Sequence, residues 1–154
     1  MKQAINESTL YEYFSQFTPT QLKTFYTILV FCRTHNKSFI TMKKFFILWC
    51  ELNDLCYGLD KSFPNPRIEP QRLKKYCQAH PYYFIDRLPL EQVARLFAKY
   101  CDKRRGVLVN LLQIIYEQDI KSAYQYVLDT FHLNNSAETL ATDLEKHIKK
   151  YASV

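Results

Sequence analysis

Hydrophobic residues recur along most of this chain at spacings of three and four, which is the period of an α-helix. No segment alternates strictly between apolar and polar residues over more than a few positions, as a half-buried strand would. The pattern predicts an all-α fold, a compact bundle of about seven to eight short helices. The expected helices cover 8–17, 19–35, 42–55, 69–79, 89–103, 106–118, 119–131 and 137–151, with one more turn after Pro81.

Several helix starts carry local capping signals. Thr18 stands before Pro19, which suits the first helical position, and Gln21 follows three residues after Thr18. This arrangement is a capping box, in which each of the two polar side chains satisfies a backbone N–H of the other residue. Further caps are expected at Thr41, at Asp119, and at Asn135 or Ser136.

Two segments are more apolar than a surface helix needs to be. The segment 19–35 is apolar around most of its circumference and is therefore expected to be the central helix of the bundle. The segment 42–55 is similarly crowded, and one domain of this size has limited room to bury both. Phe45, Phe46 and Trp49 are therefore candidate partner-binding residues, and the same apolar load is compatible with a homodimer.

The length of 154 residues predicts a single domain, 1–154. A proline-rich loop at 56–68 is expected to separate an N-terminal helical subdomain, 1–55, from a C-terminal one, 69–152. Because a segment of fewer than 60 residues is marginal for folding alone, the two are not expected to be independent.

Several enzyme classes are disfavoured by the composition. With only Gly58 and Gly106, the chain holds neither a P-loop nor a GxGxxG phosphate-binding motif. It also lacks the HExxH motif of zinc proteases and the GxSxG motif of hydrolases. We therefore expect no enzymatic activity and no cofactor, with a Cys101–His80 dyad left as the open catalytic alternative.

The five cysteines are expected to be free, mostly buried thiols of a cytoplasmic protein. The N-terminus shows no apolar signal region, and no apolar run is long enough to span a membrane. Two pairs with i, i+3 spacing, Cys32/His35 and Cys77/His80, would together make a Cys₂His₂ zinc site. Both pairs lie near helix ends with the cysteines on apolar faces, so no metal site is expected.

The formal net charge of +6 is concentrated in the middle of the chain. Residues 1–60 carry six Lys/Arg and five Asp/Glu, residues 61–110 carry eleven and four, and residues 111–154 carry four and six. The basic excess of the middle third predicts a surface for a polyanion. Its candidate nucleic-acid-binding cations are Arg67, Arg72, Lys74, Lys75, Arg87, Arg95, Lys99, Lys103, Arg104 and Arg105.

The segment "YCDKRRGVLV" has two interpretations. On a helix over 89–103, Arg95, Lys99 and Lys103 form an outward stripe opposite an apolar face. Alternatively, "CDKRRG" is only a helix end, with cations in the last turn and Gly106 as the left-handed residue after it. The second interpretation accounts for those six residues but leaves the other basic positions of 67–105 unexplained.

Two functions follow from these patterns. The leading hypothesis is a non-enzymatic nucleic-acid-binding subunit or accessory protein that uses residues 67–105, with Tyr82 and Tyr83 stacking on bases. Cations interleaved with aromatics favour single-stranded or distorted nucleic acid over a regular duplex. A helix-turn-helix over 90–116 is disfavoured, because its second helix is too apolar to lie exposed in a DNA groove. The alternative is a helical adaptor or inhibitor, as from a mobile element or bacterial parasite, that binds an acidic protein through 42–55 and the basic face.

Overall fold

The computed structural model describes residues 6–151, and within this range the chain forms nine α-helices and no strand. The all-α prediction is therefore confirmed, with slightly more helices than expected. The helices are α1 (Glu7–Gln16), α2 (Pro19–Thr34), α3 (Met42–Leu59), α4 (Pro70–Ala79), α5 (Tyr83–Arg87), α6 (Leu90–Tyr100), α7 (Arg105–Glu117), α8 (Ile120–Phe131) and α9 (Ala137–Lys150).

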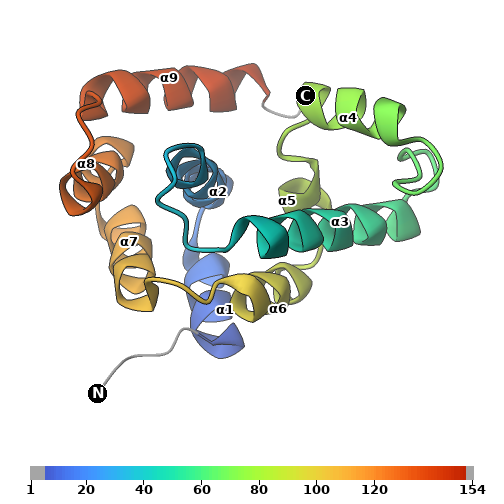
Figure 1. Cartoon of the computed structure of the whole chain (residues 1–154), viewed down its shortest axis with the longest axis horizontal. Coiled ribbons are helices and arrows are strands. Elements are labelled where there is room, and N and C mark those ends of the chain that lie inside the picture. Colours follow the sequence, from blue (N-terminus) through green and yellow to red (C-terminus); the bar gives the residue numbers. More distant parts are fainter. Residues whose placement is uncertain (1–5, 152–154) are drawn as a thin grey trace.

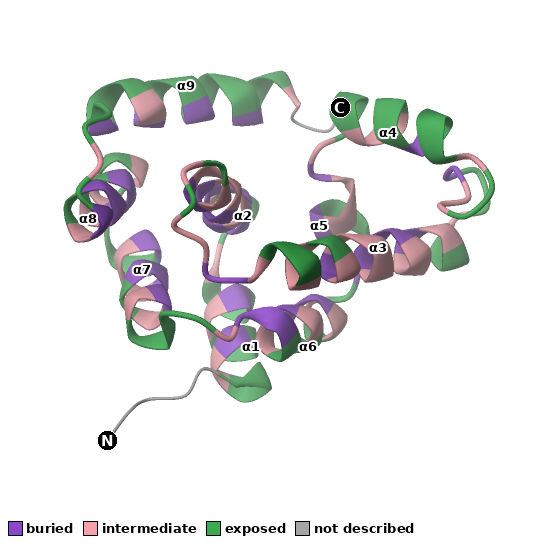
Figure 2. Ribbon diagram, viewed as in Figure 1, coloured by how far each residue is buried: buried purple, intermediate pink, exposed green. Residues whose placement is uncertain are grey.

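Helix α2 occupies the centre of the bundle, as its apolar circumference predicts. Figure 1 shows it nearly end-on, with the other helices arranged around it, and it packs against α5, α7, α8 and α9. Buried residues in Figure 2 line the sides of the surrounding helices that face inward. A helix with partners on several sides buries even polar positions, and Lys23 and Thr24 of α2 are both buried.

The core joins segments that are distant in the sequence. Phe97 of α6 contacts Phe14 of α1 and Phe25 of α2, with ring centroids 6.2 and 5.9 Å apart, respectively. All three rings are fully buried, and both contacts have the edge-to-face geometry that aromatic pairs favour. The core therefore includes residues from both sides of the proline-rich loop, while the proposed subdomain boundary stays a prediction.

The capping signals are confirmed where they are purely local. Thr18 and Gln21 form the complete capping box at the start of α2. The side chains of Thr41, Asp119 and Ser136 accept hydrogen bonds from the backbone at the starts of α3, α8 and α9, respectively.

The predicted end of the third helix is wrong by one turn. Helix α3 continues to Leu59 and includes Gly58, so the following loop covers 60–69 and not 56–68. Leu52 and Cys56 are buried one turn apart on the same face of α3. Their burial offsets the cost of about 1 kcal/mol that a glycine imposes on a helix.

The interpretation of "CDKRRG" as a simple helix end is also wrong. Helix α6 ends at Tyr100, so Lys103 lies outside it, and Gly106 is the second residue of α7. The left-handed residue of this segment is Arg104, with a φ of 51°, and neither glycine has a positive φ.

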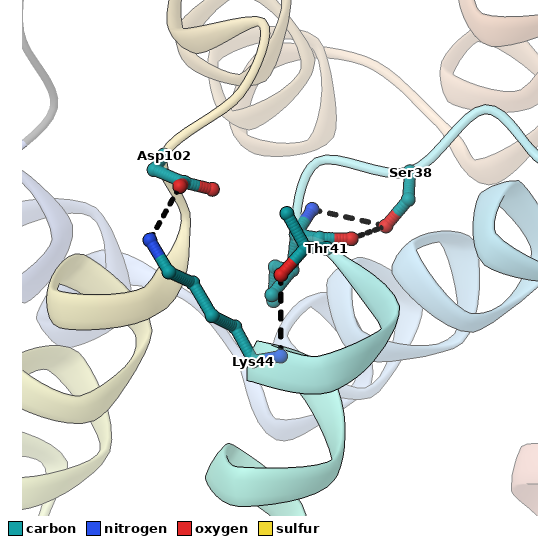
Figure 3. A network of polar contacts seen from close by, with 5 residues as sticks. Ser38, Thr41, Lys44 and Asp102 are labelled. Atoms are coloured by element: carbon teal, nitrogen blue, oxygen red, sulfur yellow. Dashed lines mark hydrogen bonds and ion pairs between the residues drawn. The ribbon is translucent and has the colours of Figure 1, made fainter.

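Tertiary contacts explain why the chain leaves α6 early. Figure 3 shows Lys44 of α3 reaching Asp102, with 2.6 Å between Nζ and Oδ2. The backbone N–H of Lys103 donates to the carbonyl of Phe39 at 3.1 Å. Ser38 and Thr41 order the neighbouring α2–α3 loop through bonds to Ile40 and to the N–H of Lys44. The segment between α6 and α7 is therefore held against this loop.

Candidate functional site

All ten cations predicted to bind nucleic acid are exposed, but the fold does not gather them on one surface. Arg72, Lys74 and Lys75 belong to α4, whereas Lys103 and Arg104 precede α7. Figure 1 shows α4 and the start of α7 on opposite sides of the molecule. The excess charge of the middle third is thus divided between separate faces.

Four of these cations already have carboxylate partners. Three of the four ion pairs cross between segments and are Arg67–Asp54 at 3.4 Å, Arg95–Glu7 at 3.1 Å and Lys99–Glu51 at 3.9 Å. The fourth, Arg72–Glu69 at 3.0 Å, is local. In the predicted Arg95–Lys99–Lys103 stripe, two cations are therefore paired with carboxylates, and Lys103 lies outside the helix.

Three adjacent cations without such a partner among the described residues form the linker cluster, which we define as Lys103, Arg104 and Arg105. All three side chains are exposed, and none pairs with a carboxylate within the described residues 6–151. The guanidinium of Arg104 lies 5.1 Å from the ring centroid of Phe131 in α8.

Neither predicted stacking tyrosine is a free platform. Tyr82 is 3% exposed, and its ring lies beneath Lys23 and beside His147 of α9, so the prediction that it stacks on bases is wrong for this conformation. Tyr83 is half-buried, and its hydroxyl donates to Asp60 Oδ2 at 2.9 Å. Burial and this hydrogen bond both raise the pKa of Tyr83.

A polar cavity of about 400 Å³ lies between the α4–α5 loop and the end of α9, and we call it the tyrosine cavity. Its lining includes Tyr76, Tyr83 and Tyr151 together with two exposed cations, Arg87 and Lys150. Arg87 packs over the Tyr83 ring at 5.3 Å, and Asp86 supplies a carboxylate to the same lining. In this cavity a predicted tyrosine, Tyr83, meets a predicted arginine, Arg87.

An apolar groove of about 670 Å³ lies between α2, α3 and α4, and we call it the α3 groove. Met42, Phe46 and Trp49 line it from α3, at i, i+4 and i+7. Met42 is 69% exposed and Phe46 64%, although large apolar side chains are usually covered. The opposite wall includes Leu73 of α4, and the exposed first turns of α3 are visible in Figure 2.

Two cations, Arg33 of α2 and Lys74 of α4, line this apolar groove. Arg33 of α2 places its guanidinium 4.4 Å from the ring centroid of Phe45. Its Nε is buried without a hydrogen-bond partner, and no carboxylate of residues 6–151 pairs with it. A buried charged donor left without an acceptor costs about 1–3 kcal/mol or more. Arg33 as a whole is half-buried, so it is the Nε–H of this cation that residues 6–151 leave without an acceptor.

The cysteine chemistry considered from the sequence finds little support in the geometry. Burial raises the pKa of the Cys101 thiol to about 12 and that of Cys77 to about 11, which disfavours the nucleophilic thiolate. His80 packs against Tyr76, with 4.5 Å between ring centroids. Within residues 6–151 no three His, Cys, Asp or Glu side chains are placed to hold a metal, so the Cys32/His35 and Cys77/His80 pairs do not form a shared site.

Sequence reasoning found Phe45, Phe46 and Trp49 but missed Arg33 and Met42. Phe45 and Trp49 are half-buried, and Phe46 packs parallel to Trp49 with 6.5 Å between centroids. An arginine within a helix that is otherwise apolar nearly all round was the available signal for Arg33. Its position opposite α3 depends on helix packing and could not be derived from periodicity.

In comparisons with known proteins, no family model, no curated protein and no solved structure matched this chain. Among residues 6–151, no helix combines the length and the apolar character that crossing a bilayer demands. The geometry of the described residues therefore carries the functional argument.

Proposed function

We propose that this protein is a helical adaptor or inhibitor that binds another protein through the α3 groove. The observation that carries the proposal is the ridge formed by the exposed Met42 and Phe46 with the half-buried Trp49, along one wall of an apolar groove. Contiguous exposed apolar surface beside polar residues is typical of interaction sites, and aromatic residues often supply most of their binding energy. We place this interaction in the cytoplasm, because all five cysteines are free thiols.

Site-specific photo-crosslinking tests the proposal. A photoreactive phenylalanine analogue replaces Phe46 in one protein and Leu59 in another, and each is irradiated in a cell lysate. Leu59 is a matched control because it is 62% exposed on the same helix but lies outside the groove. We expect a discrete adduct from position 46 that is absent from position 59 and lost when Trp49→Ala is added. Equal adducts at the two positions, or none at 46, would reject the groove as the binding surface.

A second candidate function is nucleic-acid binding through the linker cluster. The supporting observation is that Lys103, Arg104 and Arg105 are exposed and free of carboxylates within the described chain. Three adjacent cations release few counterions, so binding through this cluster alone would be weak and strongly salt-dependent.

Fluorescence anisotropy with labelled single-stranded and duplex oligonucleotides, across ~50 to 300 mM salt, tests this second candidate. We expect Lys103→Gln with Arg105→Gln to weaken binding by about tenfold, because two phosphate contacts are lost. The matched control is Arg95→Gln, which removes one cation already paired with Glu7. Affinity that is unchanged in the double variant, or absent even at low salt, excludes the linker cluster.

A further inference from the structure

The α3 groove is lined by positive charge as well as by apolar side chains. Arg33 of α2 and Lys74 of α4 stand on two of its walls, and none of the described lining residues is a carboxylate. The whole chain carries a net charge of +6. Two copies meeting groove to groove would bring their Arg33 and Lys74 side chains together, so charge complementarity favours an acidic occupant over this form of self-association.

We propose that the occupant of the α3 groove is an acidic amphipathic helix, with one of its carboxylates paired to Arg33. This inference rests on the proposed function and adds the chemistry of the partner. A carboxylate would give the Arg33 guanidinium the acceptor that it lacks within residues 6–151. Guanidinium–carboxylate pairs are short, directional and often bidentate, and they gain strength where apolar walls exclude water.

The shape of the groove selects a helix as the occupant. Met42, Phe46 and Trp49 follow the i, i+4, i+7 spacing of one helix face and together span about 10 Å of α3. A ridge of this kind packs against the complementary apolar stripe of a second helix. An added β-strand would need a free sheet edge, and residues 6–151 contain no strand.

The stacking of Arg33 on Phe45 prepares the guanidinium for such a contact. The 4.4 Å separation between Cζ and the ring centroid holds the cation against an aromatic face. Fixing the side chain in this way lowers the entropy lost when a carboxylate binds. Lys74, which is exposed on the opposite wall, offers a second and more flexible positive charge.

A displayed peptide library tests the inference. Peptides of about 14 residues, roughly four helical turns, carry fixed leucines on one face and random Asp, Glu, Lys, Arg or Gln elsewhere. A second set carries proline-rich sequences of the same length. Both are selected on the wild-type protein and depleted on Phe46→Gln, so that only groove binders remain. We expect the survivors to be acidic helical peptides.

Two variants then identify the contact. Arg33→Met keeps an apolar stem over Phe45 but removes the charge, and we expect it to weaken the selected peptides about tenfold. Lys121→Met on α8 is the matched control, because it removes an exposed cation outside the groove and should change affinity less than about twofold. Thermal unfolding of each variant verifies that the fold is retained.

The outcomes separate the inference from the proposed function. Enrichment of basic, neutral or proline-rich peptides that still depend on Phe46 would overturn the acidic helix and leave the groove as a binding site. Equal losses for Arg33→Met and Lys121→Met would also overturn it, because the attraction would then be general charge. Acidic peptides whose affinity falls with Arg33→Met but not with Lys121→Met support the inference. Failure of crosslinking at position 46 would instead reject the proposed function.

Discussion

Lys44 of α3 and Asp102, which follows α6, form an ion pair with 2.6 Å between Nζ and Oδ2 (Figure 3). The pair joins residues 58 positions apart and fixes the segment that precedes α7. The hydrogen bond from Lys44 is the largest of the effects that lower the pKa of Asp102, while the other carboxylate oxygen is buried without a partner. This contact is a tertiary determinant of where α6 ends.

Lys44→Met should lower the free energy of unfolding by about 1 kcal/mol near pH 7, because the pair is only partly exposed to water. Since the folded-state pKa of Asp102 is depressed, its contribution is present above the unfolded pKa of about 4 and is lost as the pH falls through the folded value. Urea unfolding at about pH 7 and about pH 3 should therefore show a difference that shrinks in acid. Lys43→Met, an exposed neighbour without an ion pair among the described residues, is the control. A loss that does not depend on pH would assign the effect to packing.

Phe97→Ala should destabilise the fold by about 3–5 kcal/mol, because the ring joins α1, α2 and α6 and is 1% exposed. Phe14 and Phe25 would form apolar walls of the cavity left behind. Phe46→Ala makes the same chemical change at an exposed position and should cost less than about 0.5 kcal/mol. Denaturant unfolding of the two variants measures both values, and similar losses would contradict the packing described for Phe97.

Gly106→Ala tests whether Gly106 lies within α7 or is the left-handed residue that ends α6. In α7 an added Cβ at Gly106 meets nothing within 4 Å, so alanine should stabilise the protein by a few tenths to about 1 kcal/mol. If Gly106 were instead the left-handed residue after α6, alanine would destabilise it by about 1 kcal/mol. Gly58→Ala, in α3 with equally open space, should behave in the same direction. Thermal unfolding gives the sign of each change.

Alkylation should modify Cys50 first. Cys50 is half-buried and lines the α3 groove, where a reagent can reach it, although burial raises its pKa. Cys32, Cys56 and Cys101 are buried, and burial raises their pKa values to about 12. Cys77, with a pKa of about 11, should follow slowly. Mass spectrometry after timed iodoacetamide treatment measures the order, and the denatured protein provides the reference in which all five react alike. Early labelling of Cys101 would refute the buried placement of that thiol.

Local sequence signals predicted much of the fold because they act within one helical turn. The cap at Thr18 with Gln21 needs no tertiary contact, and neither does the N-cap at Asp119. The end of α6 depends on Lys44 and on Phe39, both of which belong to a distant part of the chain. Because periodicity contains no information on these contacts, the predicted helix extended to residue 103 and not to Tyr100.

The candidate site shows the same division between local and tertiary information. A helical wheel places Arg95 and Lys99 outward, and both are exposed. Their carboxylate partners, Glu7 and Glu51, lie on other helices, so the wheel cannot show that the charges are already neutralised. Tyr82 was predicted to stack on bases because it is interleaved with the cations of 67–105, but Lys23 of α2 and His147 of α9 cover it.

The packing of α1 against α6 and α7 has a consequence for synthesis on the ribosome. Tyr13 donates to Gln113, a partner 100 residues later, and Phe14 needs Phe97 to complete its burial. Phe25 of α2 can cover part of Phe14 early, with 5.5 Å between ring centroids, but the contacts of α1 with α6 and α7 form only after residues 90–117 have been translated. Contacts this distant in sequence slow folding and leave the incompletely packed chain open to aggregation.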